Sequence, residues 1–402
     1  MTLVFDRREQ FVGQPMTHAL LIGVSEYTQL PAYNEPPNPE TFNLKRLASC
    51  ALSAWEICRW LEANKDSLVC PLGTIRLLMS PSELEKSAFE SIKASREGWL
   101  NLEPSGVDAA DWTHFVPEAL AWRTDTARAN KKGTSFFYYS GHGLRRNGSD
   151  LITLADFGDP LAGGRLLRSF ELVSNFVMGM APTDDRRDMA RNQFYFVDCC
   201  REDIVDSAYP GTVWGTLSGR DDRATPVFMA SYPGAVAMAI RGKPTDFCHA
   251  LLKCLPIGTD AATPDDQWIV TSFSLNRALE AYFTKLGTGQ YAPGTGISFR
   301  DVPLHRLPGP PPVEFNLVIK PSNAVGGTTV SLRHTDGLFD GQFPAAASEH
   351  PYEVHSFAGI HEILATPSGA FKPYSKLKPI VPFWTELPID LIPNPPQPPE
   401  SV

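Results

Sequence analysis

Two short motifs each place a reactive side chain directly after an apolar, aromatic-rich run. Phe136-Phe-Tyr-Tyr139 leads into Ser-Gly-His142-Gly, and Phe194-Tyr-Phe-Val197 leads into Asp-Cys-Cys200-Arg. If both runs are strands of one parallel sheet, their carboxyl ends open on the same crevice, where such sheets bind ligands. We therefore expect His142 and Cys200 to face each other, although about sixty residues separate them.

A cysteine beside a histidine can carry out nucleophilic acyl transfer. The imidazole raises the thiolate fraction or accepts the thiol proton during attack. The reaction also needs donors aimed at the developing oxyanion, and the backbone N–H groups of Gly143 and Cys200 follow the two strand ends. Glycines on both sides of His142 leave room for a substrate backbone. These residues predict a catalytic dyad with an oxyanion hole.

Each motif alone has a plainer interpretation. A cysteine after an apolar strand usually serves packing, and a histidine between glycines is often a turn residue. His142, Cys199 and Cys200 could also suggest zinc, but adjacent cysteines fit the spaced ligand patterns poorly and no second Cys-x-x-Cys pair occurs. We expect no metal. The two motifs together, in an α/β context, favour the dyad.

The motifs YYSGHG at 138–143 and VDCCRED at 197–203 resemble those of the caspase-like cysteine peptidases, metacaspases and their bacterial relatives above all. Weaker similarity lies in ALLIGV at 19–24 and VFMASYPGAVA at 227–237, and the resemblance covers roughly residues 15–290. It implies a caspase-like fold, cysteine endopeptidase activity in regulated proteolysis, and no organic cofactor. His142 and Cys200 match the catalytic positions, Gly143 matches the oxyanion glycine, and Cys199 is the bystander.

The resemblance also implies a substrate specificity. Metacaspases cleave after Arg or Lys, and their pocket residues map to Ser140 and Asp198. The chain departs from the pattern after its second predicted strand, where Ser80 and Ser82 stand in place of a further Asp. Acidic residues near 184–206 could suggest calcium, but acidic loop residues are usually only solvated. We predict a preference for basic residues and no calcium site.

The surrounding pattern alternates strands with helices, which predicts a mostly parallel sheet covered by helices on both faces. Asn43 is a candidate N-cap for a helix that runs through Leu61. A further helical segment is expected at roughly 168–180. The expected strands are 18–24, 74–79, 134–139, 194–197 and 225–230, and the other expected helices are 114–129, 247–255 and 274–286.

The composition changes at the Pro-rich stretch 307–312. We expect a caspase-like peptidase domain over residues 1–306, a small all-β domain over 313–392 and a Pro-rich tail over 393–402. The β-domain is a candidate site for a regulatory protein partner. Two alternatives stay open. One is a catalytically silent caspase-like module that acts as a protein-binding scaffold, and the other is an acyl-transferring or hydrolytic enzyme that acts on something other than protein.

The bulk composition limits the partners. A formal net charge of −9, from 36 basic and 45 acidic residues, gives no reason to expect nucleic acid or an anionic membrane. No run of eighteen apolar residues occurs without charge, so no membrane span is expected. Seven cysteines without framework spacing and no secretory pattern favour the reducing cytoplasm. The expected partner is a protein or peptide substrate.

A last candidate concerns activation of the enzyme. The connection that follows Cys200 contains Arg220 and Arg223 among small and polar residues. Such connections are usually exposed and easily cut. If the enzyme cleaves after basic residues, Arg220 or Arg223 is a candidate self-processing site.

Overall fold

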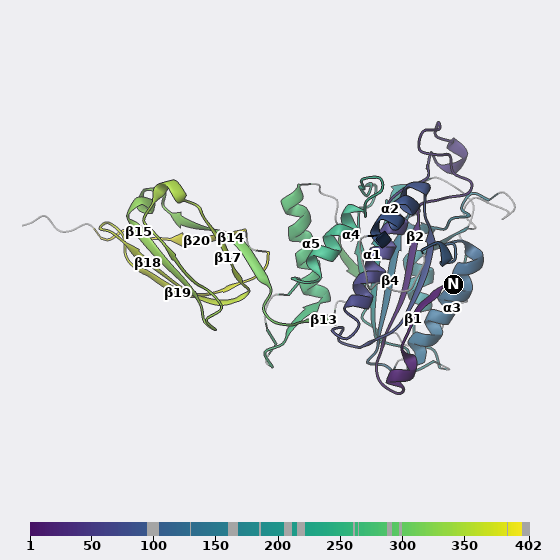
Figure 1. The fold of residues 1–402 in the computed structure, drawn as a ribbon, viewed down its shortest axis with the longest axis horizontal. Coiled ribbons are helices and arrows are strands. Elements are labelled where there is room, and N and C mark those ends of the chain that lie inside the picture. Colours follow the sequence, from purple (N-terminus) through teal and green to yellow (C-terminus); the bar gives the residue numbers. More distant parts are fainter. Residues whose placement is uncertain are drawn as a thin grey trace, which may run out of the picture. The chain divides into compact units, whose positions relative to one another are not determined.

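A computed structural model of the chain divides into two compact units (Figure 1). One unit comprises Met1–Lys253 with Tyr282–Leu304, and the other comprises Cys254–Ala281 with His305–Val402. Residues 254–281 thus belong with the second unit, although the domain predicted from the sequence over residues 1–306 includes them. The structure describes residues 1–94, 104–128, 130–159, 168–184, 186–204, 211–214, 222–259, 262–263, 265–287, 292–296, 300–383 and 385–395.

The first unit contains a seven-stranded sheet in the order β1-β3-β2-β4-β8-β10-β12. The five inner strands are parallel, and the two edge strands β1 and β12 are antiparallel to their neighbours. The five predicted strands are confirmed and lie in the parallel part. The bounds are β1 Leu3–Asp6, β2 Thr17–Val24, β3 Leu72–Ser80, β4 Thr134–Ser140, β8 Asn192–Asp198, β10 Pro226–Met229 and β12 Ala292–Gly296.

Every residue of β2, β3 and β4 is buried, as expected for apolar strands with helices on both faces. Figure 1 shows α1 and α4 on one side of this sheet and α3 on the other. Helix α2 was not foreseen. The helices are α1 Cys50–Ala63, α2 Glu83–Ala94, α3 Trp112–Arg128, α4 Asp246–Cys254 and α5 Ser272–Leu286, with short turns η1 Arg8–Phe11, η2 Pro39–Thr41 and η3 Pro104–Gly106.

The start of α1 corrects one prediction. Asn43 does not cap a helix: its φ is 60°, and α1 begins at Cys50. Its first N–H groups are bound by side chains from distant segments, because Ser25 Oγ accepts from Cys50 N–H at 3.0 Å and Glu85 Oε1 accepts from Leu52 N–H at 3.1 Å. These partners satisfy donors that a helix start leaves free, so the start of α1 is fixed by tertiary contacts.

A second, four-stranded sheet joins the loops that follow β4 and β8. It has the order β7-β6-β5-β9, and β5 pairs in parallel with β9 through Leu144 and Glu202. The segment 168–180, expected to be helical, begins with β7 and is helical only from Leu172, where the π-helix η6 starts. The bounds are β5 Gly143–Arg146, β6 Ser149–Thr153, β7 Ser169–Glu171, η6 Leu172–Val177 and β9 Glu202–Asp203.

Residues 312–390 form two sheets around a common core, so the chain is a mixed α/β protein with all-β sheets in its C-terminal part. In β14 the buried residues alternate with exposed ones, as expected for strands with one solvated face. The sheets have the orders β17-β14-β20 and β16-β15-β18-β19. Phe315 and Leu317 from one sheet and Leu332 and Ile363 from the other belong to one apolar cluster.

The remaining elements are β11 Trp268–Thr271, β13 Pro303–Leu307, β14 Pro312–Lys320, η7 Ser322–Gly327, β15 Thr328–His334, β16 Asp340–Phe343, η8 Ala347–Glu349, β17 Tyr352–Phe357, β18 Gly359–Pro367, β19 Tyr374–Ile380 and β20 Glu386–Asp390. None of the helices within the described ranges is long and apolar enough to cross a membrane.

Candidate active site

The loops after β4 and β8 lie side by side. Ser140 pairs with Asp198 at the last position of the parallel register, and Gly141 N–H donates to the Asp198 carbonyl at 3.3 Å. Beyond them Gly143 packs so closely on the other loop that an added Cβ would clash with the Cys200 carbonyl oxygen and with Cys199 Sγ. The glycine after the histidine is therefore required by close approach of two backbones.

The two adjacent cysteines occupy different environments. Cys199 is 5% exposed, belongs to the apolar core, and burial holds its thiol pKa well above the usual range. Cys200 is more accessible, and its Sγ accepts a hydrogen bond from Ala237 N–H at 3.2 Å. Burial also raises the Cys200 pKa, partly opposed by this N–H. Of the two thiols, only Cys200 is placed to meet a substrate.

His142 is held in one orientation. Its Nε2 lies 2.6 Å from the Lys45 carbonyl oxygen. Because a carbonyl can only accept, Nε2 carries a proton, and in the neutral ring Nδ1 is the free base. Burial lowers the His142 pKa to about 4, and the Lys45 carbonyl only partly opposes this. The imidazole is therefore neutral at pH 7 and able to accept a proton.

The backbone of His142 sits in a closed ring of hydrogen bonds. Its N–H donates to the Tyr27 hydroxyl at 2.7 Å, and its carbonyl accepts from Thr153 Oγ1 at 2.9 Å and from the Tyr139 hydroxyl at 2.7 Å. Tyr27 and Thr153 are 3.2 Å apart. Since Thr153 donates to the carbonyl, Tyr27 must donate to Thr153. The Tyr27 ring also packs on the imidazole, with centroids 4.9 Å apart.

In the described part of the chain no hydrogen bond joins His142 to Cys200: His142 Nε2 donates to the Lys45 carbonyl, and Cys200 Sγ accepts from Ala237 N–H. With the Cys200 pKa raised and the His142 pKa lowered, both groups are uncharged at pH 7. An ion pair between thiolate and imidazolium is thus not the resting form. The arrangement can support attack in which the base takes the thiol proton as the bond to substrate forms.

Asp198 and Ser140, the predicted specificity residues, are both buried and in contact. Asp198 is 2% exposed, and its Oδ2 accepts from Ser140 Oγ at 3.1 Å, from the Tyr138 hydroxyl at 2.8 Å and from Thr245 Oγ1. Burial raises the Asp198 pKa to about 6, against the effect of these hydroxyls. Within the described ranges its other oxygen, Oδ1, has no partner. A buried carboxylate oxygen without a donor suits a cationic ligand group.

The segment 232–241 runs past the nucleophile with its apolar side chains exposed. Arg201 N–H donates to the Ala235 carbonyl at 3.0 Å, and Gly234 N–H donates to the Arg201 carbonyl at 2.9 Å. The exposed fractions are 48% for Val236, 51% for Met238 and 61% for Ile240. This alternation of exposed apolar residues beside Cys200 offers a surface along which an extended chain could lie.

Two other expectations concern processing and metals. Arg223 is 2% exposed and donates to the Val177 carbonyl and to Gln193 Oε1, both at 2.8 Å, so the expectation of an exposed cleavage site does not fit it. Arg220 lies outside the described residues. Over the described ranges, no three His, Cys, Asp or Glu side chains are grouped to hold a metal ion.

Sequence reasoning missed three contributors to the site. Lys45 acts through its carbonyl, which any residue type would supply, so no sequence signal marks it. Thr245 lies at the start of α4, far along the chain from Asp198. Tyr27 follows the first apolar strand within three residues of Val24, and only its place after a strand end of the same sheet could have suggested a role.

Comparisons with known proteins add little. No protein-family model matches the chain, and no curated protein matches it. Twenty-eight chains of solved structures are similar to this chain. One is the crystal structure of protein GSU0716 from Geobacter sulfurreducens, with a TM-score of 0.40 and 10% identity over 73% of this chain and 98% of that chain. A likeness at this level carries no argument about function.

Proposed function

We propose that the chain is a cysteine endopeptidase with a caspase-like fold, acting in regulated proteolysis. The observation that carries the proposal is the joint placement of Cys200 and His142. The accessible thiol and a neutral, oriented imidazole lie on two loops whose backbones touch at Gly143. A pseudoenzyme would have no chemical need for both groups at one sheet edge.

The proposed reaction proceeds through an acyl-enzyme. The Cys200 thiol proton passes to His142 Nδ1 as Sγ attacks the scissile carbonyl carbon, giving a tetrahedral oxyanion. Collapse breaks the C–N bond, and the imidazolium gives its proton to the leaving amine. Water then attacks the thioester with His142 again as base, releasing the carboxylic acid and the free thiol. The N–H groups of Gly143 and Cys200 are the proposed oxyanion donors.

The proposed specificity is cleavage after Arg or Lys. The basic side chain would reach Asp198 Oδ1, with Ser140 beside it. A charge-assisted contact of this kind is worth about 1.5–3 kcal/mol, or roughly tenfold to hundredfold in preference. The residues that precede the scissile bond would lie along Val236, Met238 and Ile240, which supports a protein substrate over a small molecule.

A second candidate function is a catalytically silent module that binds proteins. The observation in its favour is that the thiol and the imidazole are both uncharged and bound to backbone groups. In both readings the C-terminal β-domain is a proposed partner-binding unit. Its sheet face exposes Leu377 and Ile360 to 65% and 49%.

Hydrolysis of casein by the wild type, Cys200→Ala and Cys199→Ala separates the two functions. Cleavage that is abolished in Cys200→Ala and retained in Cys199→Ala is expected. Cys199→Ala is the matched control because the same atom is removed one residue away. Equal loss of cleavage in both folded variants would defeat the assignment of Cys200. If the wild type does not cleave casein and its thiols do not react with peptide electrophiles, the silent module is favoured.

A further inference from the structure

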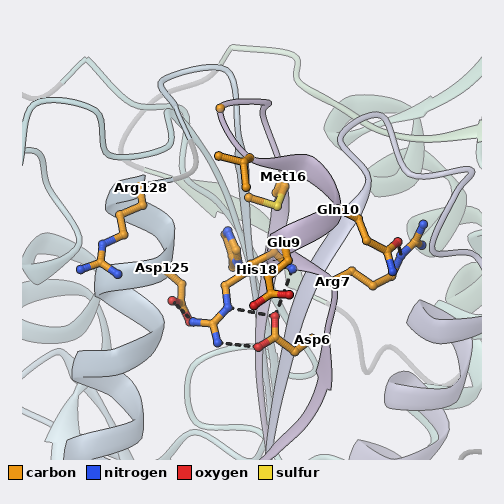
Figure 2. A pocket seen from close by; sticks show the side chains of 11 residues that line it. Asp6, Arg7, Glu9, Gln10, Met16, His18, Asp125 and Arg128 are labelled. Carbon is orange, nitrogen blue, oxygen red and sulfur yellow. Dashed lines mark hydrogen bonds and ion pairs between the residues drawn. The ribbon is translucent and has the colours of Figure 1, made fainter.

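A cavity of about 640 Å³ lies at the amino-terminal edge of the parallel strands (Figure 2). His18, which lines it, pairs with Ser135 near the start of β4, whereas the candidate catalytic loop begins after Ser140. Five steps along a strand correspond to about 16 Å. The cavity is therefore separate from the Cys200 site, and its size falls within the roughly 300–1,000 Å³ of small-molecule sites.

Part of the cavity wall is fixed by ion pairs. Arg8 contacts Asp6 at 2.5 Å and Asp125 at 2.7 Å, and Asp125 also pairs with the buried Arg76 at 2.8 Å. These two ion pairs place Arg8 between the two carboxylates, which come from β1 and α3. Asp125 is only 4% exposed. The wall is thus built before any ligand binds, which reduces the entropy lost on binding.

Other groups at the cavity have no partner in the described part of the chain. Glu9 and Arg128 line it as solvent-exposed side chains that take part in no ion pair there, and Figure 2 shows that they come from different elements. His18 is 1% exposed, and its Nδ1 lies 2.8 Å from Thr74 Oγ1 while its Nε2 has no partner. Buried polar atoms nearly always have one. A bound polar molecule or water would supply it.

The charges around the cavity balance. Three carboxylates and three guanidinium groups line it. The carboxylates would repel a phosphate, and the guanidinium groups would repel a metal ion. An apolar ligand would leave the polar lining unpaired. Complementarity favours a ligand that carries both signs of charge.

We propose that this cavity binds a small zwitterion, a free amino acid or a short peptide. Its ammonium group faces Glu9, its carboxylate faces Arg128, and a polar group of its backbone satisfies His18 Nε2. The apolar portion rests against Met16 and Val12, which also line the cavity. The site lies entirely within the first unit and does not depend on the thiol chemistry.

Calorimetry on the full chain tests the proposal. The Cys200→Ala protein is titrated with glycyl-leucine and, separately, with leucine, so that a peptide ligand and a free amino acid are distinguished. One-site binding by at least one of the two, with Kd below about 10 mM, is expected. Arg128→Gln and Glu9→Gln should each weaken it about tenfold to hundredfold, because each removes a charge-assisted contact. N-acetyl-glycyl-leucine amide and inorganic phosphate should not bind.

Arg187→Gln is the matched control, since Arg187 is 75% exposed and does not line the cavity. It should bind like the parent protein. Thermal unfolding without ligand checks that every variant is folded. Absence of binding by both zwitterions, or an affinity unchanged in both Arg128→Gln and Glu9→Gln, would overturn the proposal. Equal binding of the blocked peptide would overturn the zwitterion class.

Discussion

The hydrogen-bond ring around His142 makes Tyr27 a positioning residue, and Tyr27→Phe removes only its hydroxyl. The ring still packs on the imidazole at the centroid distance of 4.9 Å. What is lost is the acceptor for His142 N–H at 2.7 Å and the donor to Thr153 at 3.2 Å. Tyr27 is fully buried, so water does not replace the hydroxyl without rearrangement.

The magnitude follows from that burial. A buried donor left without a partner costs about 1–3 kcal/mol, and a unit of this size loses about 2–4 °C in Tm per kcal/mol. If the His142 backbone shifts to find another acceptor, misplacement of the base by about 1 Å lowers kcat roughly a hundredfold. We expect kcat to fall about tenfold to hundredfold while KM stays within about twofold, because Tyr27 does not contact substrate.

The assay is steady-state hydrolysis of an arginyl peptide beside thermal unfolding of each protein. Tyr195→Phe is the matched control: Tyr195 is equally buried, and its hydroxyl donates to Gln193 Oε1 at 2.9 Å, away from His142. The control should have a lower Tm than the wild type but the same kcat. If Tyr27→Phe lowers Tm as the control does but has the wild-type kcat, then the hydroxyl does not position His142 and the reasoning is refuted.

Three further predictions follow from named contacts. Gly143→Ala should reduce kcat/KM below about 1% of wild type, since its Cβ clashes with the Cys200 carbonyl. Gly309→Ala is the control and should leave kcat/KM unchanged, because no atom lies within 4 Å of its added Cβ. A fully active Gly143→Ala would contradict the loop contact. Preference for Arg over a neutral residue should fall as pH drops through about 6, where Asp198 protonates, to about a tenth by pH 5. Asp198→Asn should show no such change, and a preference that is flat in the wild type would rule out Asp198 as the determinant. Burial lowers the His18 pKa to about 4. Below about pH 6.5 the unfolded state therefore binds more protons than the folded state, so the free energy of unfolding decreases as the pH falls. Urea unfolding should show His18→Gln losing roughly 2 kcal/mol less than wild type between pH 7 and pH 5, and equal losses would mean that His18 is not buried neutral.

The parallel sheet and the meeting of the two motifs could be predicted from sequence because both depend on local patterns. Apolar runs such as 134–139 and 194–197 mark buried strands, and parallel strands bring their carboxyl ends to one edge. The placement of Ser140 beside Asp198 follows from the same register. These features need no knowledge of distant contacts.

The features that escaped prediction depend on residues far apart in the chain. Helix α1 begins at Cys50 because Ser25 and Glu85 bind its first N–H groups, and neither is near it in sequence. The orientation of His142 depends on the carbonyl of Lys45, and a carbonyl leaves no trace in residue type. The burial of Arg223 likewise depends on the tertiary fold.

The most direct test of the central claim is mapping of covalent labelling by a peptidyl acyloxymethyl ketone that ends in arginine. Intact mass followed by peptide mapping reads both the number and the position of adducts. The account predicts one adduct, on Cys200, kept in Cys199→Ala and slowed about a hundredfold or more in His142→Ala through loss of the general base. An adduct on Cys199, or labelling of Cys200 at a rate indifferent to His142, would contradict it.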